Sequence, residues 1–376
     1  MTGTFEINPT LSFTMLGSCT LYAVSRPTRS AWASVAAIAV MMRFAVVRLR
    51  GGFGSYYGAS WITWGAFLGL ASIVVLAVQV ARARGDALRH RFLRETFFAA
   101  CVFPVLTLLA GDALRFIAWI DPNTLDAFLL KFDGSLGFQP SFLLGKMLAS
   151  VPKLWGSTTI VYYALPLGVS ILYASHIRRA RDGEPLRVSV LGLFLSLIAV
   201  GTCAYALFPA TGPAHSYSTL YPWHSPSLTR IVIEPIFGGN ALRNCMPSLH
   251  FAGALAIFWN ARLWPRWGRF LAGVFLLATA FATLALGEHY LADLVVAFPF
   301  TLFFQAAWSG KVPVRDAWRF RGLLGGGILT IVWLALLRYG LQVFVLSPFI
   351  PWAAIATTTS WCWFAQYNLE TRNSTT

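Results

Sequence analysis

The sequence predicts an all-α polytopic membrane protein, and three observations lead to this fold class. Of the 376 residues, 57% are hydrophobic and only 11% are charged, whereas a soluble domain carries about 25% charged residues. Apolar runs long enough to cross a bilayer recur along the chain. Basic residues gather in the polar loops between these runs, as in loops on the cytoplasmic side. These features exclude a soluble cytosolic enzyme, a disordered chain and a secreted disulfide scaffold.

The membrane segments follow from the apolar runs, because a bilayer core of roughly 30 Å needs about 20 apolar helical residues. With two weaker candidates, Thr10–Val24 and Phe349–Phe364, we expect eight to eleven helices. The stronger segments are Ala31–Val47, Trp61–Val80, Glu95–Ile120, Ser157–His176, Val188–Phe208, Leu249–Trp264, Phe270–Leu286, Tyr290–Trp308 and Leu323–Phe344.

Charge sets the orientation of the helices. The net charge is +15, from 29 basic and 14 acidic residues, and in so apolar a chain this excess favours anionic lipid over nucleic acid as the partner. Four loops carry most of the arginines and fall on one side, which we interpret as cytoplasmic. They are centred on Arg82–Arg94, Arg178–Arg187, Arg262–Arg269 and Lys311–Arg321.

The opposite side holds three polar segments, Asp121–Gly156, Pro209–Ser248 and Gly287–His289. Since they connect helices of one bundle, we expect them to converge on one face. The five cysteines are scattered without a CxxC pair, and the histidines of the outer loop lack further ligands at suitable spacing, so no metal site is expected.

Two motifs stand on this outer face. One runs Arg243–His250 and reads RNCMPSLH, and the other runs Gly287–Asp293 and reads GEHYLAD. The histidines, His250 and His289, are 39 residues apart with a two-helix hairpin between them. That length crosses the bilayer and returns, so both imidazoles should lie at the same membrane surface.

The residue types in these motifs suit phosphoryl transfer. His289 and Asp293 are spaced i, i+4 and share a helix face, so the carboxylate could fix the imidazole tautomer and leave one nitrogen to attack. Ser248 is a predicted N-cap, and a helix N-terminus favours phosphate. His250 could act as general acid, and Arg243 could clamp phosphate oxygens. Together they describe transfer through phosphohistidine.

A structural interpretation of the same residues is available. A single histidine near a membrane interface is more often an interfacial polar residue than a catalyst, and an i, i+4 His–Asp pair commonly supports a helix end. The occurrence of both motifs in this order on one side of the membrane favours the catalytic interpretation.

The two motifs resemble the second and third signature motifs of the type 2 phosphatidic acid phosphatase superfamily, and more narrowly its inositol phosphorylceramide synthase-like branch. The resemblance covers roughly residues 95–310. It implies a six-helix catalytic core at 95–310. The apolar runs outside this core predict N-terminal transmembrane helices at 1–94 and C-terminal helices with a short polar tail at 311–376. It also implies that His289 is the nucleophile, Asp293 its partner and His250 the general acid.

The chain departs from the superfamily pattern in its phosphate-binding cations. Phe208–Pro213 lies where the first motif belongs but has no cation, and Ala282–Thr283 replaces the usual Ser-Arg. The candidate replacements are Arg243, Arg115 and Lys131, although Arg115 could equally pair with Asp112. A nearby acid, Asp133, opens a predicted turn and could contact a head group.

These inferences predict a metal-independent lipid phosphotransferase or phosphatase with a phosphohistidine intermediate and no cofactor. It would move a phosphoryl or phospho-head group, such as inositol phosphate, between membrane lipids. The alternative is a phosphatase hydrolysing phosphatidic acid or isoprenyl (pyro)phosphate, and a remote alternative is a non-enzymatic lipid carrier. The Ala/Arg-rich loops favour a bacterial inner membrane with the site on the periplasmic side, whereas a eukaryotic Golgi enzyme would place it in the lumen.

Overall fold

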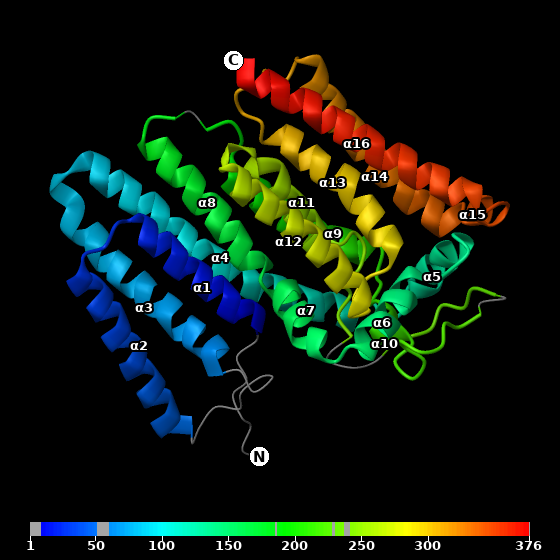
Figure 1. Cartoon of the computed structure of the whole chain (residues 1–376), viewed down its shortest axis with the longest axis horizontal. Helices are drawn as coiled ribbons and strands as arrows, with labels where there is room; N and C mark the ends of the chain where they lie inside the picture. The colour runs from blue at the N-terminus through cyan, green and yellow to red at the C-terminus, as the bar shows by residue number, and fades with distance from the viewer. Residues whose placement is uncertain (1–8, 51–59, 185, 228–229, 237–240, 376) are drawn as a thin grey trace. The chain divides into compact units, whose positions relative to one another are not determined.

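A computed structural model describes residues 9–50, 60–184, 186–227, 230–236 and 241–375. Over these residues the chain is helical, with turns and loops between helices (Figure 1). The described residues form no β-strand, and their one extended pairing is an isolated bridge between Asn123 and Pro235. The predicted all-α fold class is therefore confirmed.

Six described helices are long and apolar enough to cross a membrane, which supports an integral membrane protein. A seventh span results if the broken pair α7 (Lys153–Tyr163) and α8 (Leu165–Arg181) is counted as one. The six are α2 (Arg29–Arg50), α3 (Ser60–Arg82), α4 (Ala87–Ile120), α9 (Val190–Leu207), α12 (Arg266–Ala285) and α14 (Ala317–Tyr339).

The sequence predicts eight to eleven membrane helices, whereas six or seven described spans are long and apolar enough. The shortness of several predicted helices explains most of this difference. The two helices that follow the outer-face motifs are short: α11 ends at Asn260 and covers only Leu249–Asn260, and α13 covers only Leu291–Ala307. At 1.5 Å per residue, the 12 residues of α11 reach about 18 Å, short of a bilayer core. The weaker candidates form α1 (Pro9–Val24) and α16 (Phe349–Thr375). Neither of these two helices is long and apolar enough to count as a candidate membrane span.

The contacts divide the chain into two compact units. Unit 1 comprises Met1–Leu109 and Tyr163–Leu186, and in it α1 packs against α3 and α8. The α1–α3 contact depends on Gly69, where an added Cβ would lie 2.0 Å from the carbonyl oxygen of Met15. Small residues of this kind let membrane helices approach closely.

Unit 2 comprises Ala110–Tyr162 and Arg187–Thr376 and contains both histidine motifs. Helix α13 is its centre: it packs against α11, α14 and α16, and α11 packs against α12 (Figure 1). Unit 2 also contains short helices, of which α6 packs against α12. They include α5 (Asp126–Ser135), α6 (Pro140–Ser150), α10 (Pro213–Ser216) and α15 (Gln342–Val345).

Candidate active site

His289 lies in the tight connection between α12 and α13. Gly287, with φ of +73°, turns the chain after α12, and the His289 N–H donates to the Thr283 carbonyl at 3.1 Å. The Ser141 hydroxyl of α6 donates to the His289 carbonyl at 2.8 Å. The His289 side chain is fully buried, so its backbone and ring are held on all sides by unit 2.

Two buried carboxylates cap the N-terminus of α13, directly after His289. Asp293 accepts the Tyr290 N–H at 2.7 Å. Asp133 of α5 accepts the N–H groups of Leu291 and Ala292 at 2.8 and 3.2 Å. Asp133 thus lies inside a helix rather than in the predicted turn, and burial raises its pKa to about 8. These bonds satisfy backbone donors that a helix start leaves free and fix α13 against α5.

The two nitrogens of the His289 ring have different environments. Nδ1 lies 3.0 Å from the Cys245 carbonyl oxygen and 3.4 Å from Asp293 Oδ2. The Cys245 thiol donates to the same Oδ2 at 2.7 Å. Nε2 is buried without a hydrogen-bond partner among the described residues. A proton held on Nδ1 by the carbonyl and the carboxylate leaves the Nε2 lone pair available.

His250 occupies the first turn of α11, as the sequence predicted. Ser248 is the N-cap, and its hydroxyl accepts the Phe251 N–H at 3.3 Å. The His250 ring stacks on Tyr162, with centroids 3.9 Å apart, and its centroid lies 6.2 Å from that of His289. The α11–α12 hairpin therefore brings the two imidazoles to one place.

The segment that stands where the superfamily has its first motif is bound to an acid. Asp126 of α5 is buried and accepts the N–H groups of Thr211 and Gly212 at 3.0 and 2.8 Å. It also accepts the Tyr290 hydroxyl at 3.0 Å. Burial raises the pKa of Asp126. These two backbone donors are engaged with a carboxylate of the chain itself and are not free for phosphate.

The three outer polar segments meet at Gly212. Its φ is +89°, and an added Cβ would lie 2.4 Å from the Glu288 carbonyl oxygen. Beside it, the Ala214 N–H donates to the Gly287 carbonyl at 2.9 Å. With the Asp126 bonds, these contacts join segments 121–156, 209–248 and 287–289 around His289, as the sequence predicted.

The Arg243 side chain is buried, and its hydrogen bonds go to backbone carbonyls. Its guanidinium donates to the carbonyls of Ala241, Pro122 and Ile236, the last two at 2.6 and 2.9 Å, and burial lowers its pKa. Nε has no hydrogen-bond partner among the described residues. The side chain therefore ties segment 209–248 to segment 121–156, and the Nε–H and one Nη1–H are left for a phosphate oxygen.

The other predicted phosphate ligands lie in two different settings. Arg115 is exposed on α4 and pairs with Asp112 at 2.8 Å, which is the structural alternative considered from the sequence. Lys131 of α5 lines a cavity of about 270 Å³ together with Ser135 and Gln139.

The outer loop histidines also differ from each other. His215 Nε2 lies 3.6 Å from Glu288 Oε1, and the hydrogen bond and charge of Glu288 raise the pKa of His215. His224 is exposed.

One group of side chains has the composition of a metal site. Ligand atoms of Cys245, His289 and Asp293 lie within 4.8 Å of one another. Thiolate is the form of cysteine that binds metals, whereas burial and the neighbouring Asp293 raise the pKa of the Cys245 thiol well above its usual value. The hydrogen bonds among the three side chains account for their proximity.

Several residues of this site were not predicted from the sequence. Cys245 supplies the carbonyl for Nδ1, Tyr162 stacks on His250, and Ser141 binds the His289 backbone. A signal did exist for Asp126 and Asp133: two acids seven residues apart in an apolar segment share one helix face.

These features define a class: a helical membrane protein in which polar segments enclose a buried His–Asp pair opposite a second histidine. A family model described as the PAP2 superfamily matches residues 127–307, which contain all three of these side chains. The match covers 181 of the 376 residues and holds at the level of the superfamily. Comparison with curated proteins and with solved structures found no match.

Proposed function

We propose that this protein is a lipid phosphotransferase or phosphatase of the PAP2 superfamily that acts through a phosphohistidine at His289. The observation that carries the proposal is the His289 ring: Nδ1 is held by the Cys245 carbonyl and Asp293, while the buried Nε2 is free. The His250 ring is close by, with its centroid 6.2 Å from that of the His289 ring.

The mechanism divides into two displacements. In the first, His289 Nε2 forms a bond to phosphorus, the bond from phosphorus to the leaving alkoxide breaks, and His250 supplies the proton that the alkoxide takes up. Burial and the neighbouring His289 lower the pKa of His250 to about 3, so His250 gains this proton only when the anionic donor binds beside it. In the second, a hydroxyl of the acceptor gives its proton to His250 and attacks phosphorus, and the P–N bond breaks. Asp293 and the Cys245 carbonyl stabilise the charge that the His289 ring carries between the two steps.

The acceptor decides between the two activities. Water would make the protein a phosphatase for phosphatidic acid or isoprenyl (pyro)phosphate, whereas a lipid or polyol hydroxyl would make it a head-group transferase. The full burial of His289 and Asp293 favours transfer, because exclusion of water protects a reactive intermediate from hydrolysis. The GEHYLAD motif and its synthase-like form agree with this choice.

Phosphate contacts are proposed from the remaining candidates. The start of α11 behind Ser248 offers a helix N-terminus, and Arg243 offers its Nε–H and one Nη1–H. Lys131 lines the cavity that it shares with Ser135 and Gln139, and Arg115 would have to leave Asp112 to contribute. We place the active face in the periplasm of a bacterial inner membrane, or in the Golgi lumen of a eukaryote.

The test uses the full chain in nanodiscs, in buffer without divalent metal, with phosphatidic acid or with phosphatidylinositol plus ceramide. All phosphorus-containing products are resolved for wild type, His289→Ala and the control His224→Ala, an exposed histidine of the outer loop. A phosphosphingolipid with released diacylglycerol establishes transfer, and free phosphate establishes hydrolysis. Either product should vanish in His289→Ala and persist in His224→Ala.

The same preparation tests the intermediate. Brief incubation with a labelled donor should leave an acid-labile, base-stable phosphate on wild type but not on His289→Ala. If His289→Ala retained wild-type turnover, the mechanism would be wrong. If no lipid of a broad panel reacted with either protein, the non-enzymatic carrier would become the better explanation.

A further inference from the structure

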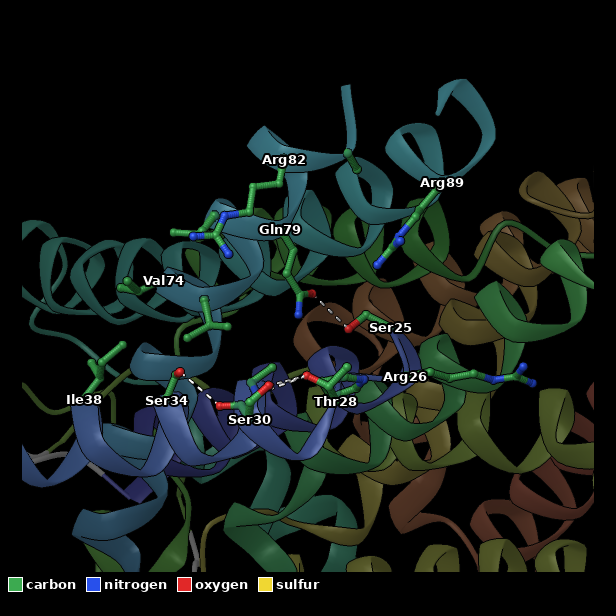
Figure 2. A pocket seen from close by; sticks show the side chains of 15 residues that line it. Ser25, Arg26, Thr28, Ser30, Ser34, Ile38, Val74, Gln79, Arg82 and Arg89 are labelled. Carbon is green, nitrogen blue, oxygen red and sulfur yellow. Dashed lines mark hydrogen bonds between the residues drawn. The ribbon is translucent and has the colours of Figure 1, made fainter. Parts of the chain in front are cut away.

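A cavity of about 480 Å³ lies in unit 1, between the turn that precedes α2 and the C-terminal end of α3 (Figure 2). All of its lining residues fall within residues 25–38 and 74–89. The cavity is therefore separate in sequence from the segment 127–307 and from the residues around His289.

The charge of the lining is entirely positive. Arg26, Arg82 and Arg89 contribute to it, and no acidic side chain does. None of the three guanidinium groups forms a hydrogen bond or ion pair with another residue in the described part of the chain. Uncompensated guanidinium groups around a concave space attract an anion, and they bind phosphate oxygens in particular.

Uncharged polar groups line the cavity beside the arginines. Gln79 extends from the same side as Arg82 and Arg89, and hydroxyl groups including Ser30 extend from the opposite side (Figure 2). The opposite side is the start of α2, where the Thr28 hydroxyl accepts the Ala31 N–H at 3.3 Å. The positive end of the 22-residue α2 dipole thus adds to the arginine charge.

The remaining wall is aliphatic. Ile38 of α2 and Val74 and Val78 of α3 line it, and both helices are candidate membrane spans. A cationic, hydroxyl-rich end that continues into an aliphatic wall along two such helices matches the two chemical parts of a phospholipid. A small soluble anion would make no use of the aliphatic part.

We propose that this cavity binds an anionic phospholipid, with its phosphate between Arg82, Arg89 and the start of α2 and an acyl chain along Ile38 and Val78. Arg26 lies in the turn at the entrance to α2 with φ of +52°, a conformation that non-glycine residues adopt infrequently. That turn presents both Arg26 and the N-terminus of α2 to the cavity.

The experiment measures lipid retention by the full chain in detergent with native mass spectrometry. The probes are phosphatidylglycerol, the zwitterionic phosphatidylcholine, and inorganic phosphate as a competitor. The variant Arg82→Gln/Arg89→Gln is compared with Arg29→Gln/Arg84→Gln, which removes the same charge from the same basic region but from residues that do not line the cavity. Tm and size-exclusion elution confirm that each variant folds.

Wild type and the matched control should retain one phosphatidylglycerol, and the cavity variant should bind it at least tenfold more weakly. Val78→Trp, which fills the cavity and keeps every arginine, should cause a similar loss. Displacement by inorganic phosphate would show that the site recognises the phosphate itself and admits a soluble source, whereas its failure would show that the acyl chain is needed. The proposal would be overturned if both double variants retained phosphatidylglycerol equally, or if wild type bound phosphatidylcholine as tightly as phosphatidylglycerol.

Discussion

Asp126 holds the outer segments against the active site, and its removal gives the sharpest test of that arrangement. The carboxylate accepts the N–H groups of Thr211 and Gly212 and the hydroxyl of Tyr290, the residue after His289. We therefore expect Asp126→Ala to destabilise unit 2 and to reduce lipid turnover, although Asp126 is not expected to contact the substrate.

The magnitude follows from the atoms involved. In Asp126→Asn, the remaining Oδ1 keeps Gly212 and Tyr290, but an NH₂ group replaces Oδ2, and the Thr211 N–H keeps only its longer contact to Oδ1 at 3.2 Å. This weakened buried bond costs at most about 1–3 kcal/mol, partly offset because a buried charge is removed. In Asp126→Ala the N–H groups of Thr211 and Gly212 and the hydroxyl of Tyr290 lose their acceptor, while the Thr211 hydroxyl keeps Ser216, and we expect a loss of about 4 kcal/mol.

Thermal unfolding in detergent measures these effects. A loss of about 2 kcal/mol corresponds to a decrease in Tm of about 4–8 °C for a domain of the size of unit 2. Asp121→Asn is the control, because among the described residues its carboxylate accepts only the Asn123 N–H, at an exposed position. Combined with Tyr290→Phe, Asp126→Ala should show a coupling of about 1 kcal/mol. Unchanged Tm and turnover in Asp126→Ala would refute the argument.

Three further predictions concern neighbours of His289. Asp293→Asn should lower kcat by up to about 10⁴-fold, because this carboxylate orients the catalytic histidine. Cys245→Ala should lower kcat less, because the carbonyl that binds Nδ1 belongs to the backbone and remains. Lipid turnover in nanodiscs measures both. Because Glu288 raises the pKa of His215, protonated His215 stabilises the fold fully below about pH 6.5, and this contribution disappears as pH rises through the raised pKa. His215→Gln should thus lower Tm at pH 5.5 but not at pH 9.5, and the reverse order would contradict the pairing. Gly212→Ala should cost about 2 kcal/mol or more, from positive φ and from overlap with the Glu288 carbonyl, seen as a lower Tm.

The features of the structure that could be predicted from the sequence are those that depend on local sequence patterns. Apolar length predicted membrane helices, and the Ser248 cap placed the start of α11. The hairpin length predicted that His250 and His289 would meet, and their ring centroids are 6.2 Å apart. Each of these inferences uses residues close in sequence or a fixed helical rise.

The parts that could not be predicted depend on backbone partners far away in sequence. Asp133 binds N–H groups of α13, and Arg243 binds a carbonyl at Pro122. Backbone groups are the same at every residue, so such partners leave no side-chain pattern to find. For this reason the sequence alone does not distinguish an Arg243 that binds phosphate from one that binds backbone carbonyls.

The charges around His289 lead to a final prediction about the substrate. Three buried acids, Asp126, Asp133 and Asp293, hold the connection between α12 and α13 in which His289 lies. Their carboxylates accept hydrogen bonds mainly from backbone N–H groups. Such surroundings disfavour a phosphate monoester with two negative charges relative to a diester with one.

We therefore expect phosphatidylinositol to give a higher kcat/KM than phosphatidic acid, which agrees with head-group transfer. The preference should grow as pH rises through about 8, because Asp133, whose pKa is raised to about 8 by burial, then acquires its charge. Competition between the two donors in one nanodisc preparation at pH 6.5 and 9 measures this, with Asp133→Asn as the variant that should lose the pH dependence. A preference for the monoester that strengthens at high pH would mean that a cation, such as Lys131 or Arg243, dominates the field at phosphorus.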